Sequence, residues 1–248
     1  MILNNPPIVA AFCQIKYERD AAVLTRLASI ANEVEHFYPI RTDHFSAEIG
    51  GLDEVIKKGV GETSFRATSK AQLNRVEFRS KDQQKKLIIS EEFIFFSDET
   101  KYSCWGEFKS SLNEIFQCLD FVLKGLNIDR VSLRYVNRFV FDQFDDPTEF
   151  FTTTISSSSD YKDDGDIFKY GFRLLAKYPS SNIVSNVNHS LDIDPFNKYN
   201  YILDIDVLDH SRLVYDKETI MSNLDAVNEK LTDIFFNSIT EKTRNLCN

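Results

Sequence analysis

The sequence predicts an α+β protein in which long helices cover one face of a curved, mainly antiparallel sheet. Strand-like segments dominate the chain, two long segments carry apolar residues at helical spacing, and the order strand, helix, three strands, helix occurs twice. Neither half shows the strand–helix alternation with a glycine-rich turn that is typical of a Rossmann-like sheet. We therefore expect a duplicated β-α-β-β-β-α unit, with halves at residues 1–128 and 129–248 packed as one globular unit.

The first half is predicted to begin with a strand over residues 6–18, which two prolines open. Asp20 is a suitable N-cap for the following helix, and Pro39 ends that helix. Residues 40–61 are expected to be irregular or to carry a short helix near residues 52–58. Further strands are then expected over residues 62–69, 73–80 and 85–96, with K-D-Q-Q-K as a hairpin turn.

A continuous apolar stripe from Trp105 to Leu126 predicts the longest helix of the first half, and Gly125 supplies its stop. In the second half, Asp146-Pro147 can open a short helix, and a serine-rich polar loop follows at residues 156–166. Strands are expected over residues 168–178, 182–193 and 200–209. A last long helix follows from about residue 220, and Ser238-Ile-Thr-Glu241 predicts a capping box for a short final helix.

The mid-chain strand R-V-S-L-R-Y-V-N-R-F-V-F, residues 130–141, carries an arginine at every fourth position. Because successive side chains of a strand point to opposite faces, Arg130, Arg134 and Arg138 share one face. Tyr135 and Asn137 lie on the other face, among Leu and Phe side chains. The strand therefore presents cations on one side and a largely apolar surface on the other.

Two later strands are acidic. Asp192 and Asp194 share a face of the first, Asp204 and Asp206 share a face of the second, and the intervening P-F-N-K-Y-N suggests a hairpin that brings all four together. Four neighbouring carboxylates would repel one another, so positive charge is expected among them. We favour ion pairs with the mid-chain arginines. A divalent metal bound by the aspartates and unrelated, exposed carboxylates are the alternatives.

Composition limits the classes of protein. The chain has 248 residues, 42% of them hydrophobic, and no apolar run approaches the roughly 20 residues of a membrane span. The start lacks a basic segment followed by an apolar core, so no secretory signal is expected. Four scattered cysteines without a C-x-x-C pair favour a reducing compartment, and the cytoplasm is the expected location.

The net charge of −9 argues against tight nonspecific binding of nucleic acid. The segment over residues 57–86 is nevertheless rich in Lys and Arg, among them Arg75 and Arg79. It is either a solvated hairpin with ordinary surface lysines or a local patch that meets an anion or an acidic partner.

No catalytic motif supports an enzyme. The four histidines show no H-x-x-x-H or H-E-x-x-H spacing, and there is no P-loop, G-x-S-x-G elbow or nicotinamide fingerprint. Activity is therefore left open, with a non-enzymatic function favoured and no cofactor expected.

Four short motifs spread over nearly the whole chain carry a resemblance: the opening N-P-P-I-V, the mid-chain L-R-Y-V-N-R, the late L-D-I-D and the terminal I-T-E-K-T-R. Together they resemble a sporadically distributed bacterial family of uncharacterised proteins of about 250 residues. Its members typically open with an N-x-P-(L/I/V)-V-E strand and carry an L-R-Y-I-N-R strand. This chain has Ala10 or Ala11 where an acidic residue is common, and Val136 in place of isoleucine. The resemblance implies a mobile or defence-linked context and no particular reaction.

These observations favour a soluble binding module whose helix-free face, rimmed by the basic segment, binds a partner protein. A nucleic acid or nucleotide bound through residues 57–86 and a homodimer are left open, and no membrane is expected. The candidate binding residues are Arg130, Arg134, Tyr135, Asn137, Arg138, Arg75 and Arg79. One alternative is a metal-dependent phosphoester hydrolase that uses Asp192, Asp194, Asp204 and Asp206. Another is a nucleotide sensor in which Arg134, Tyr135 and Arg138 line one pocket.

Overall fold

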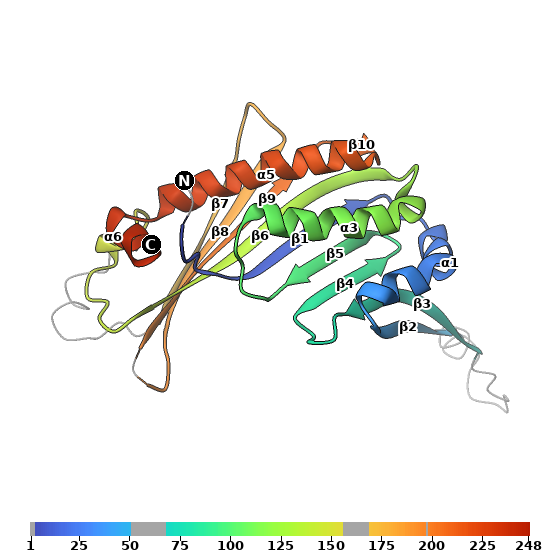
Figure 1. Ribbon diagram of the computed structural model, residues 1–248, viewed down its shortest axis with the longest axis horizontal. Helices are drawn as coiled ribbons and strands as arrows, with labels where there is room; N and C mark the ends of the chain where they lie inside the picture. The colour runs from blue at the N-terminus through green and yellow to red at the C-terminus, as the bar shows by residue number, and fades with distance from the viewer. Residues whose placement is uncertain (1–2, 51–67, 156–168, 197) are drawn as a thin grey trace, which may run out of the picture.

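The computed structural model describes residues 3–50, 68–155, 169–196 and 198–248 (Figure 1). The strands are β1 (Ile8–Tyr17), β2 (Ile40–Gly50), β3 (Thr68–Arg79), β4 (Lys85–Ser90), β5 (Phe93–Asp98), β6 (Asn127–Phe141), β7 (Tyr170–Lys177), β8 (Ile183–Ile193), β9 (Tyr199–Asp209) and β10 (Leu213–Val214). The helices are α1 (Ala22–Phe37), α3 (Trp105–Leu123), α5 (Lys217–Ser238) and α6 (Glu241–Leu246), with a 3₁₀ turn η1 (Pro147–Glu149).

All described strands form one antiparallel, ten-stranded sheet in the order β2-β3-β4-β5-β1-β6-β9-β8-β7, with the short β10 paired to β6. The first strands of the two predicted halves, β1 and β6, pair with each other in the middle. The last long strand of each half, β5 or β9, returns to pair with the first. A single sheet therefore spans the predicted boundary at residue 128.

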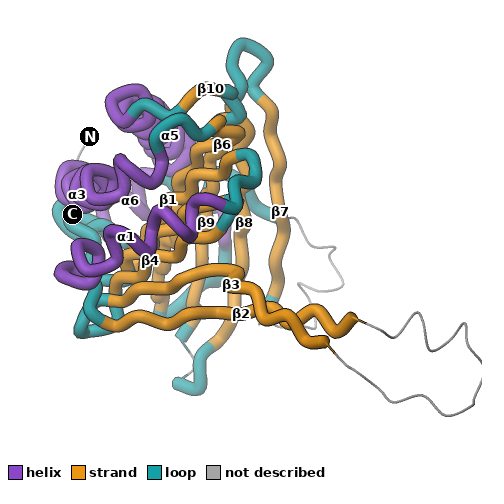
Figure 2. Tube along the Cα trace, turned by 90° about the vertical axis from the view of Figure 1, so that its right-hand side faces the viewer, coloured by secondary structure: helices purple, strands orange, loops and turns teal. Residues whose placement is uncertain are grey.

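Helices α1, α3 and α5 lie on one side of this open, curled sheet (Figure 2). Burial alternates accordingly along β6: Leu133, Tyr135 and Phe139 face the helices and are buried, whereas Arg134 and Arg138 point to the opposite side and are exposed. An antiparallel sheet with one packed and one solvated face produces this alternation. The predicted fold class is confirmed.

The core lies between the sheet and the helices. Helix α3 contributes a continuous buried stripe that includes Phe108, Leu112 and Leu119, whereas Phe121 on its outer side is exposed. Its C-terminal end follows the sequence pattern, because Gly125 adopts a φ of +81°, which a side chain with a Cβ atom disfavours.

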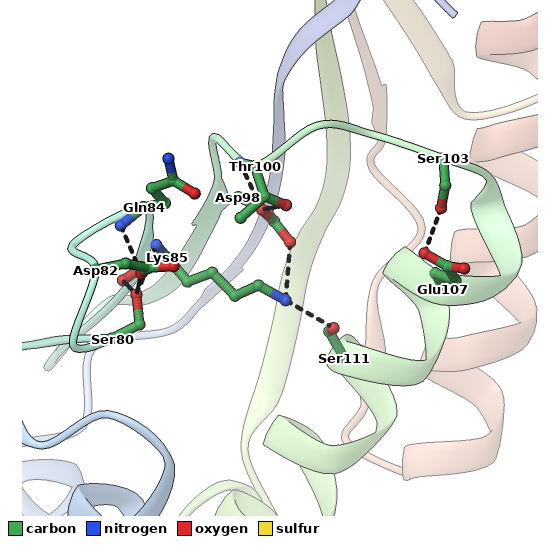
Figure 3. A network of polar contacts seen from close by, with 9 residues as sticks. All are labelled: Ser80, Asp82, Gln84, Lys85, Asp98, Thr100, Ser103, Glu107 and Ser111. Atoms are coloured by element: carbon green, nitrogen blue, oxygen red, sulfur yellow. Dashed lines mark hydrogen bonds and ion pairs between the residues drawn. The ribbon is translucent and has the colours of Figure 1, made fainter. Parts of the chain in front are cut away.

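A polar network fastens the start of α3 to the sheet (Figure 3). Lys85 extends from β4 to Asp98 at the end of β5, with Nζ 3.1 Å from Oδ2, and its Nζ also contacts Ser111 Oγ of α3 at 3.4 Å. Ser103 donates to Glu107 one turn into the helix. The β5–α3 connection is thus held at both ends.

Three strand predictions were wrong. Residues 68–79 form one continuous strand, β3, where a break between residues 69 and 73 was expected, and four described strands follow α1 in the first half in place of the predicted three. Residues 40–50 form the edge strand β2, which pairs only with β3; its apolar residues Ile40 and Phe45 are exposed, so the strand lacks a clear apolar alternation. Residues 85–96 are not one strand, because the chain reverses between Ser90 and Phe93 and forms the β4–β5 hairpin.

No Gly, Pro or Asn marks the β4–β5 turn. Instead, Ser90 Oγ accepts hydrogen bonds from the backbone amides of Glu92 and Phe93 at 3.2 and 3.1 Å. The carbonyls of Glu91 and Glu92 accept from Asp20 N and Tyr17 N, both at 2.9 Å. These partners come from the last residue of β1 and the segment after it, so a local pattern does not reveal this turn.

The N-cap of the last short helix also differs from the prediction. Thr240 accepts from Thr243 N and is the N-cap of α6, whereas Ser238 belongs to α5 and donates to Ile234 O. The short helix expected near residues 52–58, the first part of the strand expected at residues 62–69 and the polar loop at residues 156–166 lie outside the described residues.

No helix in the described ranges is long and apolar enough to cross a membrane. All four cysteines are free: Cys13 and Cys247 are buried, Cys118 is half-buried and Cys104 is exposed.

Candidate functional site

The centre of the helix-free face is an ion pair between β6 and β9. Arg134 donates to both carboxylate oxygens of Asp204, from Nε at 2.7 Å and from Nη2 at 2.8 Å. Asn188 of β8 donates to the same carboxylate at 3.2 Å. The side chain of Asp204 is only 10% exposed, whereas that of Arg134 is 49% exposed. The predicted ion pairing is confirmed for Arg134 and Asp204. The hydrogen bond to Asp204 raises the pKa of Arg134.

Asp206 lies next to this pair without a hydrogen-bond partner among the described residues. Its backbone is opposite Arg134 on β6 and Asn186 on β8, on the same face as Asp204. Burial raises the pKa of Asp206 to about 6, and the charges of Arg134 and Arg130 oppose that rise. A perturbed carboxylate among cations is typical of functional sites, although structural ion pairs also produce it.

The neighbouring arginines bind neutral amides. Arg138 donates from Nε and Nη2 to Asn200 Oδ1 at 2.9 and 2.6 Å, and Arg173 of β7 donates to Asn186 Oδ1 at 2.6 Å. Arg130 donates to Gln14 of β1, and its buried Nε has no partner in the described part of the chain. These contacts position the guanidinium groups. None of the three arginines forms an ion pair among the described residues, although the charges of Arg130 and Arg173 act on the nearby carboxyl of Asp206.

An aromatic pair lies on the β1 side of the arginines. The rings of Phe12 and Phe95 stack with centroids 5.7 Å apart, and both side chains are half-buried. The guanidinium carbon of Arg134 lies 5.6 Å from the centroid of Phe12, which is cation–π geometry. The helix-free face thus combines planar cations with accessible aromatic surface.

Charged strand residues make this face basic, in a chain of net charge −9. Register and alternation place on it the cations Lys16, Arg75, Arg79, Lys86, Arg130, Arg134, Arg138, Arg173 and Lys177, and the carboxylates Glu77, Asp192, Asp204 and Asp206.

The predicted basic segment contributes only in part. Arg75 is exposed, whereas Arg79 donates to Glu77 at 2.5 Å and is therefore paired. Lys85 points to the helix side, where it binds Asp98. Residues 57–67 of the segment lie outside the described residues.

The prediction that a hairpin brings four aspartates together was wrong. Asp192 lies opposite Asn200, near the end of the hairpin, and pairs with Lys169 at 2.9 Å. Asp194 accepts from the backbone amides of Phe196 and Lys198 in the turn, both at 2.9 Å. Strand register separates Asp192 from Asp204 by about four residues, or roughly 13 Å, and Asp194 lies about two residues further away. In the described ranges no group of three or more His, Cys, Asp or Glu side chains is placed to hold a metal ion.

Tyr135 and Asn137 belong to a different site. Both side chains point to the helix side of β6, with 3% and 1% exposure. A pocket shared by Arg134, Tyr135 and Arg138 is therefore wrong, because the thickness of the sheet separates the arginines from the tyrosine. Tyr135 and Asn137 instead line a pocket of about 260 Å³ beneath α5.

Several residues of the helix-free face are absent from the sequence prediction. Phe12 and Gln14 lie in the strand predicted over residues 6–18 and were not singled out, although the polar Gln14 was a signal that one face of this strand is exposed to solvent. Arg173 and Asn188 carry no signal of their own, since only the order of β7, β8 and β9 brings them beside Asp204 and Asp206.

The chain matches no family model, and no curated protein matches it significantly.

Arg134→Met should lower the free energy of unfolding by about 2 kcal/mol at pH 7, because it leaves the carboxylate of Asp204 desolvated without its cation. The cost is below that of a fully buried pair because Arg134 is half exposed. Arg138→Met, which loses contacts only to an amide, is the matched control. Urea unfolding checks this expectation, and equal stability of the two variants would contradict it.

Asp206→Asn should become more stable relative to the wild type as pH rises. The folded pKa of Asp206, about 6, lies above its unfolded value of about 4. The carboxyl therefore contributes stability below pH 4, and that contribution is lost as pH rises through 6. Between pH 4 and pH 7 the relative gain of the variant should be on the order of 2 kcal/mol.

Denaturant unfolding at several pH values measures this gain. Asp192→Asn is the control, because the hydrogen bond with Lys169 lowers the pKa of Asp192 and any stability from this carboxylate is lost mainly below pH 4; its difference from the wild type should stay nearly constant from pH 4 to pH 7. A constant difference between Asp206→Asn and the wild type from pH 4 to pH 7 would refute the expected environment of Asp206.

Proposed function

We propose that the protein is a binding module whose helix-free face binds an acidic segment of a partner protein. One observation carries the proposal: amides hold Arg130, Arg138 and Arg173 in place, and none of the three forms an ion pair among the described residues, on a face of an otherwise acidic chain. Planar guanidinium groups suit bidentate binding of carboxylates. Electrostatic complementarity of this kind contributes to specificity and to the association rate.

A protein partner is favoured over a nucleic acid because carboxylates interrupt the basic surface. Asp204 and Asp206 lie between Arg134 and Arg173. A continuous phosphate backbone crossing β6 to β7 would pass both of them and be repelled. A peptide can place an acidic side chain at each arginine and a neutral one in between.

The aromatic pair defines a second requirement for the partner. Phe12 and Phe95 offer half-buried rings directly beside Arg134. An apolar or aromatic side chain next to the acidic residues would pack there, and such anchors carry much of the energy of protein interfaces. The proposed partner segment is therefore acidic with an apolar residue at one end.

The cellular context and the origin of the fold are part of this proposal. The strand order supports a duplicated unit, because β5, β4 and β3 follow β1 in the sheet as β9, β8 and β7 follow β6; β2 has no counterpart among the described strands of the second half. The resemblance of L-R-Y-V-N-R to a sporadic bacterial family supports a cytoplasmic component of a mobile or defence-associated system. No observation favours the hydrolase alternative over binding.

Site-directed crosslinking in the native host tests the proposal. A benzophenone amino acid at Val140, which is 50% exposed on the helix-free face, should crosslink a protein through an acidic segment identified by mass spectrometry. The same probe at Phe121 on the exposed side of α3 should not form this product. Charge reversal by Arg138→Glu together with Arg173→Glu should reduce the product at least tenfold.

Lys124→Glu, an exposed change at the end of α3, is the matched control and should leave the product unchanged. A product that is destroyed by nuclease, a crosslinked segment without acidic residues, or a yield insensitive to the double reversal would contradict the proposal.

A further inference from the structure

The helix side of β6 carries a second site, which the acidic-partner proposal does not use. A pocket of about 260 Å³ lies between the N-terminal residues 3–8, the β5–α3 connection and α5. Tyr135 and Asn137 of β6 line it. We name it the Tyr135 pocket. An apolar cavity of about 150 Å³ holds one benzene ring, and drug-sized ligands occupy about 300–1,000 Å³, so this pocket suits a molecule of one or two rings.

Aromatic side chains form part of the pocket wall. Tyr102, Trp105, Tyr135 and Phe235 all line the pocket. The rings of Tyr102 and Tyr135 have centroids 5.2 Å apart, and Phe108 supports both from behind. Faces and edges of this kind accept a flat aromatic ligand in stacked or edge-on contact.

Two amides supply unused hydrogen-bonding groups. Asn137 Nδ2 donates to Leu203 O at 2.9 Å, and no donor in the described part of the chain contacts its Oδ1. Asn228 Oδ1 of α5 accepts from the hydroxyl of Tyr135 at 3.0 Å, and its Nδ2 has no acceptor in the described residues. The acceptor Asn137 Oδ1 and the donor Asn228 Nδ2 thus remain for a ligand. A ligand that carries an N–H group next to a carbonyl oxygen or a ring nitrogen would complement them.

Among the described residues, no Asp, Glu, Lys or Arg lines the pocket. The two tyrosines also stay neutral, because burial raises the pKa of Tyr102 to about 12 and that of Tyr135 well above its usual value. A charged ligand would lose its hydration without a counter-ion. The pocket therefore selects neutral molecules, in contrast to the helix-free face.

The walls are fixed in place. Trp105 Nε1 and Lys109 Nζ donate to the two carboxylate oxygens of Asp225 at 2.9 and 2.7 Å, which ties the start of α3 to α5. Figure 3 shows the other anchors of this connection, Lys85 to Asp98 and Ser103 to Glu107. Preorganised walls lower the entropic cost of binding a small ligand.

We propose that the Tyr135 pocket binds a neutral heteroaromatic molecule of one or two rings, which stacks on its aromatic walls and hydrogen-bonds to Asn137 and Asn228. This site explains why the motif L-R-Y-V-N-R carries a tyrosine and an asparagine between its arginines. It is independent of the acidic-partner proposal, and either can fail alone.

Two native side chains report on the pocket directly. Trp105 is the single tryptophan of the chain, so its fluorescence monitors the wall alone. Cys104 is an exposed free thiol that also lines the pocket, whereas Cys118 on the far part of α3 does not. A bound ligand should quench Trp105 and slow the modification of Cys104 by a thiol reagent, with the rate at Cys118 unchanged.

The probes are adenine, guanosine, uracil and indole, with adenosine and adenosine monophosphate as a matched neutral and charged pair. At least one neutral probe should bind with both signals. Adenosine should bind at least tenfold more tightly than its monophosphate. Asn228→Leu should weaken the best hydrogen-bonding probe about tenfold and change indole binding less than threefold.

Thr232→Phe, which places a ring in the pocket from α5, should abolish binding, whereas Asp233→Phe on the exposed side of the same helix should not. The melting temperatures of both variants should be measured to check that they are folded. If Thr232→Phe does not fold, Asn228→Leu still tests the proposal. Absence of both signals with every probe at millimolar concentration would overturn the proposal. Equal binding of the phosphorylated and neutral probes, or binding unaffected by both Asn228→Leu and Thr232→Phe, would also overturn it.

Discussion

The two candidate sites both depend on the position of β6, which lies between β1 and β9 in the sheet. Helices α1, α3 and α5 cover only one side of this sheet. Alternation along a strand then forces neighbouring residues into opposite environments. Arg134 and Arg138 enter a polar, accessible surface, and Tyr135 and Asn137 enter the packed layer beneath α5. One short motif therefore builds two chemically different sites that share a strand and no side chain.

The helix-free face is polar, but two of its carboxylates, Asp204 and Asp206, are largely buried. Their burial determines how these charges interact with the neighbouring arginines. Asp204 is desolvated and balanced by a bidentate arginine, a geometry that retains most of the attraction between the charges. Asp206 receives no such bond and has a raised pKa. Replacing such groups by apolar residues often stabilises a protein. Their presence therefore argues for a role in recognition, which the acidic-partner proposal supplies.

Strong local patterns in the sequence were sufficient for much of the fold. The stripe of α3, the alternation of β6 and the order of elements in the second half all follow from periodicity and from stops such as Gly125. Strand β2 does not, because its apolar residues Ile40 and Phe45 are exposed and form no alternating pattern. The β4–β5 turn does not either, because Ser90 and distant amides replace the usual turn residues.

The contacts of the candidate site could be predicted only where the sequence pattern identified both of the strands that contribute to them. The pairing of Arg134 with Asp204 follows from complementary charges on two such strands. The separation of Asp192 and Asp194 depends on the register of the β8–β9 hairpin, which alternation alone does not fix. The Tyr135 pocket depends on the packing of α5 and the N-terminal residues over β6, which no local pattern encodes.

Hydrogen exchange of the backbone amides measures the central claim most directly, because it ranks the strands by their protection within the folded protein. If β6 is the shared middle strand, the amides of residues 131–139 should exchange only through global unfolding, and far more slowly than those of the edge strand β7. Exchange of the β6 amides at the rate of the β7 amides would contradict the central position of β6, and with it the division of the motif into two faces.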